Sequence, residues 1–564
     1  MKTKRTPLTL VALVAAGALT LTACGGGDGS DDSSKKDSVP KSTANDINAT
    51  DRSELKTGGT LNWPLGEIAE NFNYNEIDGA LADGDAVDKA LMPYIMKSDA
   101  AGTVTPDPDY LTSAKVDDSS GTQVVTYEIN PKAKWSDGTA ISYQDFAAQW
   151  TALNGKNTQY KISSSTGYEL IKSVAKGKDD QEVVVTFSSS FGDWKSLFLP
   201  LYPASVTGTP AGFNTGYLGK IPVTAAAFKF QSIDKTAKTL TVVRDTNWWG
   251  DKALLDKIVY RALDPDATAG AFANGEVDFF NVGPDAAAYK QAKAVKGADI
   301  RMAAGPNFRH LTMNGTSGAL QDVNVRLAVV QALDRQVIAD SDLQGLDWTS
   351  KPLNNHFYVT NQKGYQDNAG EYGAYNPAKA KASLDAAGWK LSGDYREKAG
   401  KTLELNLVIP AAVSVSANEG KLIQLMLKAV GIKLTIKSVP LQEFFDKYVT
   451  PGNFDLTVFS WLGTPFPTSS NKSIYVEPKG SDVQQNYTGV GSTELDAAMD
   501  KAAADTDPAT AITDTNAADV LIWKQANLLP LYQRPDIYAV KNTLANLGAY
   551  GFADLRYQDI GFTK

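Results

Sequence analysis

The chain has 564 residues, of which 43% are hydrophobic and 21% are charged. This composition excludes a disordered protein, a collagen-like repeat and a small disulfide-stapled domain. The formal net charge of −9 argues against nucleic acid as a partner, because like charges repel. One cysteine and two histidines, His310 and His356, are too few for the usual zinc sites. We therefore expect a large globular protein without metal or cofactor.

The N-terminus has the features of an export signal. Basic residues at positions 2, 4 and 5 precede an apolar run, residues 8–19, which is too short to cross ~30 Å of hydrocarbon as a helix. The run ends in Leu21-Thr22-Ala23-Cys24, which resembles the cleavage site of bacterial lipoproteins. We predict a lipoprotein signal peptide over residues 1–23 and lipidation at Cys24, which would anchor the protein on the outer face of the cytoplasmic membrane or in the periplasm. The alternative is an ordinary secretory signal.

The segment after the signal has no capacity to form a core. Residues 25–57 contain no aromatic residue and few apolar ones, so residues 24–57 are predicted to be the lipidated cysteine followed by a disordered tether. From residue 58 onward no apolar run approaches 18 residues. We expect the whole body to lie outside the membrane.

The clearest secondary-structure pattern lies between residues 403 and 437. Leu403, Leu405 and Leu407 alternate with polar residues, residues 418–430 have apolar side chains at helical spacing, and a second alternating run follows at 432–437. This order predicts a strand, a helix and a second strand parallel to the first, with a right-handed crossover. The apolar run 454–461 then predicts a central strand buried on both faces.

The two halves of the body differ in composition. Short β-rich runs occur at 124–129, 183–187 and 240–244, so residues 58–300 are expected to be richer in strands than 310–520. This difference predicts two lobes. A single helix over residues 325–340, capped by Asp322, is expected to open the second lobe, with Arg326 and Arg335 off its apolar face.

Seven short motifs occur in collinear order over about 400 residues. They are GGTL (58–61), AGTVTP (101–106), KWSDGTAISYQDF (134–146), NWWG (247–250), NGEVD (274–278), VRLA with ALDR (325–335), and YNPAKA with AGW (375–389). Together they resemble the family 5 extracellular solute-binding proteins of ATP-binding-cassette importers, the dipeptide- and oligopeptide-binding class, in an actinobacterial form. The third motif is similar to that family's W-S-D-G-x-P-[LIV]-[ST]-A-x-D-F signature, with Ala140 where proline is usual.

The resemblance implies an α/β, two-lobed periplasmic-binding-protein-like fold of type II, similar to cluster C, with an extra β-rich subdomain in lobe I. Lobe I would span 58–305, with the subdomain at about 75–225; lobe II would span 306–527, and residues 528–564 would return to lobe I. The implied function is that of a monomeric, lipid-anchored receptor, not an enzyme. It would capture a small polar ligand, most of all an oligopeptide, and deliver it to an importer permease by hinge closure.

The resemblance also implies where the ligand binds. A strand that ends in an aromatic residue and a glycine-containing loop presents backbone groups at the carboxyl edge of a parallel sheet, where ligands bind in open α/β folds. In the family this loop pairs with an extended peptide backbone. The candidate ligand-binding residues are Ser460, Trp461, Leu462 and Thr464, to which family position adds Phe72 and Asn73. The alternatives are a purely structural Trp461 and an exposed turn around Phe72.

The sequence departs from the family at one position of the expected site. Many peptide-binding members have W-x-x-D-Y-x-D-P, in which the first aspartate pairs with the ligand's α-ammonium group; here Thr464 takes that place. A hydroxyl cannot replace a buried carboxylate, since an unpaired ligand charge costs several kcal/mol. Either another acid acts instead, or the ligand is a blocked peptide, a saccharide or a lipid-derived molecule. The candidate acids are Glu67, Glu76, Asp78 and Glu443.

Short motifs in the sequence raise two other functions, a regulatory lipoprotein and a serine enzyme. Actinobacterial relatives with a similar S-W-x-G-T-P-F-P stretch imply the main alternative, a non-transport regulatory or sensor lipoprotein of the same fold in cell-envelope glycolipid biosynthesis. For an enzyme, the S-x-x-K at 173–176 and the K-T-G at 56–58 stand in the reverse of the order found in penicillin-recognising serine enzymes, and no S-D-N follows residue 173. We therefore expect no catalytic residues.

Overall fold

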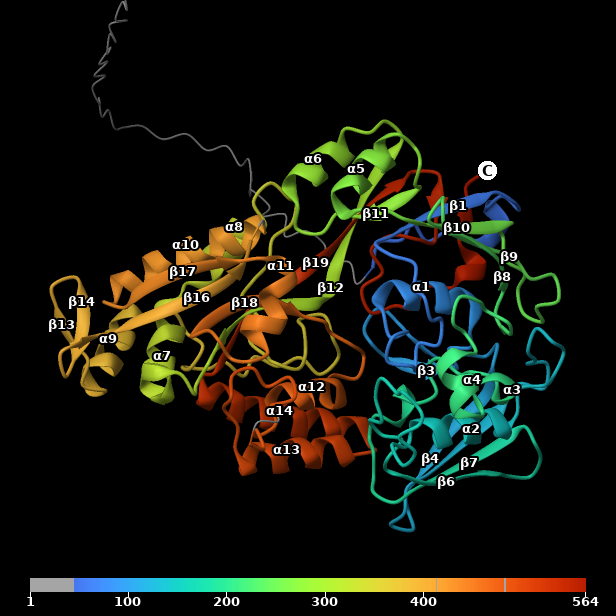
Figure 1. The fold of residues 1–564 in the computed structure, drawn as a ribbon, viewed down its shortest axis with the longest axis horizontal. Coiled ribbons are helices and arrows are strands. Elements are labelled where there is room, and N and C mark those ends of the chain that lie inside the picture. Colours follow the sequence, from blue (N-terminus) through green and yellow to red (C-terminus); the bar gives the residue numbers. More distant parts are fainter. Residues whose placement is uncertain (1–44, 412, 481–482) are drawn as a thin grey trace, which may run out of the picture. The chain divides into compact units, whose positions relative to one another are not determined.

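The computed structural model describes residues 45–411, 413–480 and 483–564. The predicted signal peptide, Cys24 and residues 24–44 of the predicted tether lie outside this part of the chain. Residues from Ser42 to Lys564 form one compact unit. Two large hydrophobic clusters within it define two lobes. The colours of Figure 1, which follow the sequence, show which parts of the chain form each lobe. We call the part around the first cluster lobe I and the part around the second lobe II.

Lobe I contains a four-stranded sheet in the order β1–β10–β9–β8. Strand β1 is parallel to β10, and the other pairs are antiparallel. The side chains of β1 alternate in burial, so Leu61, Trp63 and Leu65 enter the core. The elements are β1 (Thr60–Leu65), α1 (Ala82–Leu91), β2 (Met96–Ser98), β3 (Val104–Pro106), β8 (Phe228–Asp234), β9 (Thr239–Arg244) and β10 (Lys257–Ala262).

A second, antiparallel sheet of lobe I has the order β4–β5–β7–β6. It lies within the range predicted for the β-rich subdomain and packs against helix α2. Ser142 caps α2 in a capping box with Asp145, which also accepts a hydrogen bond from Trp135 Nε1 at 3.2 Å, so the third sequence motif is architectural. The elements are β4 (Leu111–Asp117), β5 (Val124–Ile129), α2 (Tyr143–Leu153), β6 (Ile171–Lys176), β7 (Glu182–Phe187), α3 (Ala204–Thr207) and α4 (Pro210–Thr215).

Lobe II is organised on a six-stranded sheet in the order β11–β19–β12–β18–β16–β17. The predicted strand–helix–strand unit is confirmed: β16 and β17 are parallel, with α10 between them in sequence. Strand β18 pairs with both β12 and β16, which confirms it as a central strand. The strands are β11 (Phe279–Asn281), β12 (Ala298–Met313), β16 (Glu404–Pro410), β17 (Lys433–Val439), β18 (Leu456–Trp461) and β19 (Leu528–Lys541).

The helices of lobe II include two that precede the predicted boundary at residue 305. Phe272 of α5 and Tyr289 of α6 belong to the second hydrophobic cluster. Besides α7 and α8, which are described below, the helices are α5 (Pro265–Ala273), α6 (Ala286–Lys293), α9 (Pro377–Ala386), α10 (Ser414–Ala429), α11 (Leu441–Glu443), α12 (Pro467–Tyr475), α13 (Thr493–Ala504) and α14 (Pro508–Gln525). A small sheet of β13 (Lys390–Ser392), β14 (Tyr395–Lys398) and β15 (Lys401–Thr402) follows α9.

Two long strands join the lobes. Strands β12 and β19 pair antiparallel from Ala298 opposite Lys541 to Thr312 opposite Leu528. The register shifts between Ala304 and Phe308, in the middle of the pair. Such an irregularity interrupts the ladder and allows the strands to bend.

The prediction of one helix over residues 325–340 is wrong. The structure has α7 (Val323–Ala332) and α8 (Arg335–Asp342), separated at Leu333, whose backbone is extended. Asp334 is the N-cap of α8, and its side chain accepts hydrogen bonds from the first amides of that helix. An N-cap residue has a non-helical backbone, so a second helix begins here and the first does not continue. Arg326 and Arg335 are buried and donate to backbone carbonyls. Although they lie off the apolar face, they are therefore not exposed to solvent.

The predicted disordered tether ends too late in the sequence. Asp46 forms a bridge with Ala549, and Leu55 with Thr563. Leu55 is 3% exposed, and a short 3-10 helix precedes it at Arg52–Glu54. The segment is ordered by backbone pairing with the C-terminal residues, which include the antiparallel pair β20 (Leu544–Ala545) and β21 (Gly561–Phe562). Composition alone cannot reveal such a distant partner.

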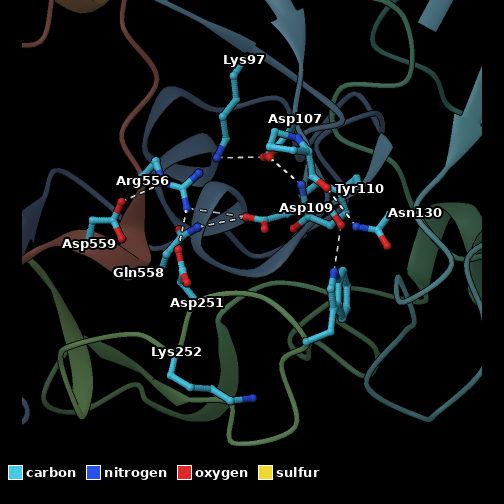
Figure 2. Close-up of polar contacts among 12 residues, drawn as sticks. Lys97, Asp107, Asp109, Tyr110, Asn130, Asp251, Lys252, Arg556, Gln558 and Asp559 are labelled. Carbon is cyan, nitrogen blue, oxygen red and sulfur yellow. Dashed lines mark hydrogen bonds and ion pairs between the residues drawn. The ribbon is translucent and has the colours of Figure 1, made fainter. Parts of the chain in front are cut away.

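A polar network holds the C-terminal segment on lobe I, as Figure 2 shows. Arg556 pairs with Asp559 at 2.7 Å and Asp251 at 3.5 Å, and Gln558 donates to Asp109 at 3.2 Å. These contacts lie beyond β19, so the chain returns to lobe I after crossing lobe II.

Candidate functional site

Strand β18 ends at the loop that the sequence singled out. Phe308 of β12 lies opposite Trp461, and Arg309 lies opposite Ser460. The Trp461 ring lies between two other rings: it is stacked on His310 with a 5.6 Å centroid separation and on Tyr487 with 5.9 Å. Burial holds the pKa of His310 well below its usual range, so this stack contains a neutral imidazole.

The loop after Trp461 is held close to β12. The Gly463 amide donates to Asn307 Oδ1 at 3.1 Å, and a Cβ at Gly463 would lie 2.0 Å from the Pro306 carbonyl oxygen. Only glycine fits this approach. Leu462 is 70% exposed, and Thr464 Oγ1 accepts from the Phe466 amide at 3.1 Å, just before α12.

A cavity of about 990 Å³ lies beside this loop. Its lobe II wall includes Thr464, Phe466 and α12, while its lobe I wall comes from the β-rich subdomain and the segment after β1. Many of its lining residues carry hydroxyl groups: Ser163, Ser164, Thr166, Tyr168, Ser189, Ser190, Ser196, Thr464, Ser469, Ser470, Ser473 and Tyr74. A hydroxyl-rich surface can bind a polar ligand directly or through water.

The second predicted wall contributes to the cavity through the residues that directly follow the two named from the sequence. Phe72 and Asn73 are 1% and 0% exposed, and Asn73 Nδ2 donates to the Phe213 carbonyl at 2.8 Å. The two residues that follow, Tyr74 and Asn75, line the cavity together with Thr464. The structure therefore brings this segment to the same cavity as Thr464 of the β18 loop, but buries the two residues that the sequence named. Ser460, Trp461 and Leu462 precede Thr464 on the loop and do not line the cavity themselves.

Most of the lobe I wall was missed at the sequence level. It is formed by residues 163–170 and 189–199, which flank β6 and β7. The available signal was a pair of triple-serine runs, at 163–165 and 188–190. Runs of this kind are also typical of ordinary surface loops, so only the fold shows that both runs meet at one cavity.

None of the four acids proposed from the sequence lines the cavity. Glu76 is buried and accepts hydrogen bonds from Asn71 Nδ2 and the Asp78 amide. Glu443 pairs with Lys447 at 2.7 Å, and Glu67 is exposed. The cavity is lined instead by Glu169 and Asp500, with Lys472 as the one basic residue among its described lining residues.

A smaller cavity of about 400 Å³ shares Phe466 with the large one. Direct contacts join the lobes beside it: Asp193 Oδ2 accepts from the Ser469 amide at 3.0 Å, and the Gly192 amide donates to the Ala503 carbonyl at 2.7 Å. Burial raises the pKa of Asp193. These bonds connect the β-rich subdomain to α12 and α13.

Within residues 45–411, 413–480 and 483–564, no three His, Cys, Asp or Glu side chains are grouped to hold a metal ion. No helix in these ranges has the length and apolarity needed to cross a bilayer.

Comparison with known proteins gives concordant matches. Residues 105–482 match the family model of bacterial extracellular solute-binding proteins, family 5, middle region. Over 526 residues the chain is 40% identical to the oligopeptide-binding protein OppA of Mycobacterium tuberculosis H37Rv, covering 93% of this chain and 88% of that protein.

Two further matches differ in extent. Over 235 residues the chain is 30% identical to the probable monoacyl phosphatidylinositol tetramannoside-binding protein LpqW of the same organism, covering 41% of this chain and 36% of that protein. The solved structure of the periplasmic EDTA-binding protein EppA superposes with a TM-score of 0.83 at 26% identity, covering 92% of this chain and 98% of that one.

Proposed function

This chain belongs to the bacterial extracellular solute-binding proteins of family 5, and we propose that it captures oligopeptides and delivers them to the permease of an ATP-binding-cassette importer. The observation that carries this proposal is the 40% identity to an oligopeptide-binding protein over 93% of the chain. Membership in an extracellular family places its site of action outside the cytoplasm. The similarity to LpqW covers only 41% of the chain and gives the regulatory alternative less support.

The geometry of the large cavity supports a peptide ligand. Its volume of about 990 Å³ is at the upper end of the usual range for ligand pockets, about 300 to 1,000 Å³. The β18 loop, with Ser460, Trp461, Leu462 and Thr464, is proposed to pair with the ligand's main chain. Main-chain pairing and hydroxyl-lined walls accept many side chains, because affinity does not depend on reading each one.

The proposed cycle needs no covalent chemistry. The lobes would close around the ligand by bending at the β12–β19 pair, and the closed state would be favoured by the contacts that ligand makes in it alone. The receptor is proposed to act as a monomer. The lipid at Cys24 would keep the receptor near its permease.

Thermal unfolding of the compact unit from Ser42 to Lys564 tests the ligand class. A pool of tri- to pentapeptides is compared with oligosaccharides and with an iron–EDTA complex. At ~100 times Kd a ligand adds ~2.7 kcal/mol, which for a body of roughly 500 residues raises Tm by about 2 to 3 °C. We expect this shift with peptides alone; a shift with saccharides or the chelate and none with peptides would overturn the proposal.

A further inference from the structure

Among the residues that the structure describes, the large cavity has one negative charge without a partner. Three of the described lining residues are charged: Glu169, Lys472 and Asp500. Lys472 forms an ion pair with Asp500, so these two charges cancel. The carboxylate of Glu169 has no hydrogen bond or ion pair with any described residue, and it is exposed in the cavity wall.

The turn that presents Glu169 is firmly held. Backbone hydrogen bonds run from the Tyr168 and Glu169 amides to the Ser165 carbonyl, at 2.9 and 3.2 Å. Gly167 has a φ of +79°, and a Cβ there would lie 2.5 Å from the ring of Phe191. The Tyr168 hydroxyl accepts from the Phe198 amide at 2.6 Å. A charge on such a turn is positioned before a ligand arrives, which lowers the ordering cost of binding.

The opposite wall of the cavity is neutral where the family's pattern would place an acid. Thr464 Oγ1 lies 3.0 Å from Ser470 Oγ, and both are hydroxyls. Ser469 and Ser473 extend this neutral surface along α12. The attraction for a cation therefore comes from the lobe I wall.

We propose that Glu169 is the counter-charge for the ligand's α-ammonium group, so that the ligand is an oligopeptide with a free amino terminus held by lobe I. This inference rests on the proposed function. A charge-assisted hydrogen bond to a carboxylate is stronger than a neutral one, and an ammonium group enclosed without a partner is strongly disfavoured. Polyanionic ligands are repelled by the same charge.

The test compares tetra-alanine with N-acetyl-tetra-alanine by calorimetric titration of the mature protein. We expect Glu169→Gln to weaken binding of the free-amine peptide by 10- to 100-fold and to leave the acetylated peptide unchanged. Glu67→Gln is the matched control, because Glu67 is an exposed acid of lobe I outside the cavity. It should change neither affinity.

The outcomes separate the two proposals. If Glu169→Gln binds free tetra-alanine as tightly as the wild-type protein does, the role of Glu169 is refuted while peptide binding stands. The same holds if both peptides weaken equally, which would indicate a loss of shape. If the wild-type protein binds neither peptide, the peptide proposal itself fails. Thermal unfolding of each variant checks that the fold is intact.

Discussion

Asp536 is a partly buried acid on β19, a strand that joins the lobes. Burial raises its pKa to about 6, against the opposing effects of a hydrogen bond from the Gly551 backbone and the nearby charge of Arg534. Arg534 Nη1 in turn lies 3.4 Å from Ser460 Oγ. The folded protein thus holds a proton on Asp536 at a pH where an unfolded aspartate, with a pKa of about 3.9, has lost it.

We predict a pH dependence of stability from this residue. Between about pH 4 and pH 6 the folded state binds more protons than the unfolded state, so the contribution of Asp536 to stability falls as the pH rises through this window, by up to about 3 kcal/mol. Asp536→Asn should remove that fall. Urea unfolding at a series of pH values measures it, and parallel curves for the wild-type and variant proteins would contradict the prediction.

Gly463 provides a second prediction at the scale of one residue. A Cβ there would lie 2.0 Å from the Pro306 carbonyl oxygen, so Gly463→Ala must push the β18 loop away from β12. We expect peptide affinity to fall by at least about tenfold, since the loop's main chain would no longer be in place. Gly270→Ala, where a Cβ meets nothing within 4 Å, should bind peptide normally. Equal affinities in titration would refute this role for the loop.

At the scale of the element, the break between α7 and α8 depends on Asp334. Its carboxylate accepts from the amides of Gln336 and Val337 at the start of α8. We expect Asp334→Ala to cost about 1 kcal/mol of unfolding free energy, measured by urea denaturation. Asp334→Ser keeps an acceptor at the cap and should lose less; equal losses would mean that the cap is not the cause.

Elements with a local signal could be predicted, and those set by distant partners could not. The alternation in β16 and the helical spacing of α10 are properties of each segment alone. The sequence does not reveal the break at Leu333, because apolar residues continue at helical spacing through it. The break arises because the side chain of Asp334 hydrogen-bonds to the backbone amides at the start of α8, which favours a new helix start over a continuous helix. The ordering of residues 46–57 depends on pairing with Ala549 and Thr563, about 500 residues away.

The candidate site likewise has one part with a local sequence signal and one part without. The β18 loop could be predicted because a buried strand that ends in Trp-Leu-Gly is a local pattern. The charge of the cavity could not be predicted, because Glu169 is separated from Thr464 by almost 300 residues and only the fold brings both to one cavity. Family position indicated Phe72 and Asn73, and this irregular segment has no periodicity that could show that Tyr74 and Asn75 face the cavity instead.

At the scale of the whole molecule, hydrogen bonds join the two lobes directly. Helix α12 has no side-chain cap from its own N-cap residue, Phe466, and the carboxylate of Asp193 supplies that hydrogen bond from the other lobe. An anion at a helix N-terminus is favoured by the free amides and the helix dipole. This bond therefore stabilises the closed arrangement.

We predict that Asp193→Ala shifts the unliganded protein towards an open form. Small-angle X-ray scattering should give a larger radius of gyration than for the wild-type protein, and peptide should restore part of the difference. Asp117→Ala is the control, because the side chain of this exposed aspartate of the same subdomain bonds to Ser119 and to no other residue that the structure describes. An unchanged radius for Asp193→Ala, with the fold intact by thermal unfolding, would show that the bond does not hold the lobes.

The pairing of the two chain ends has a practical consequence for biosensor measurements. Lys564 Nζ donates to the Ser53 carbonyl at 2.6 Å, and Leu55 forms a bridge with Thr563. A chip surface that captures the protein through a C-terminal tag therefore holds it on the side where Ser53 and Leu55 meet the C-terminal residues. Such immobilisation leaves lobe II unrestrained and the peptide cavity open to the flowing analyte.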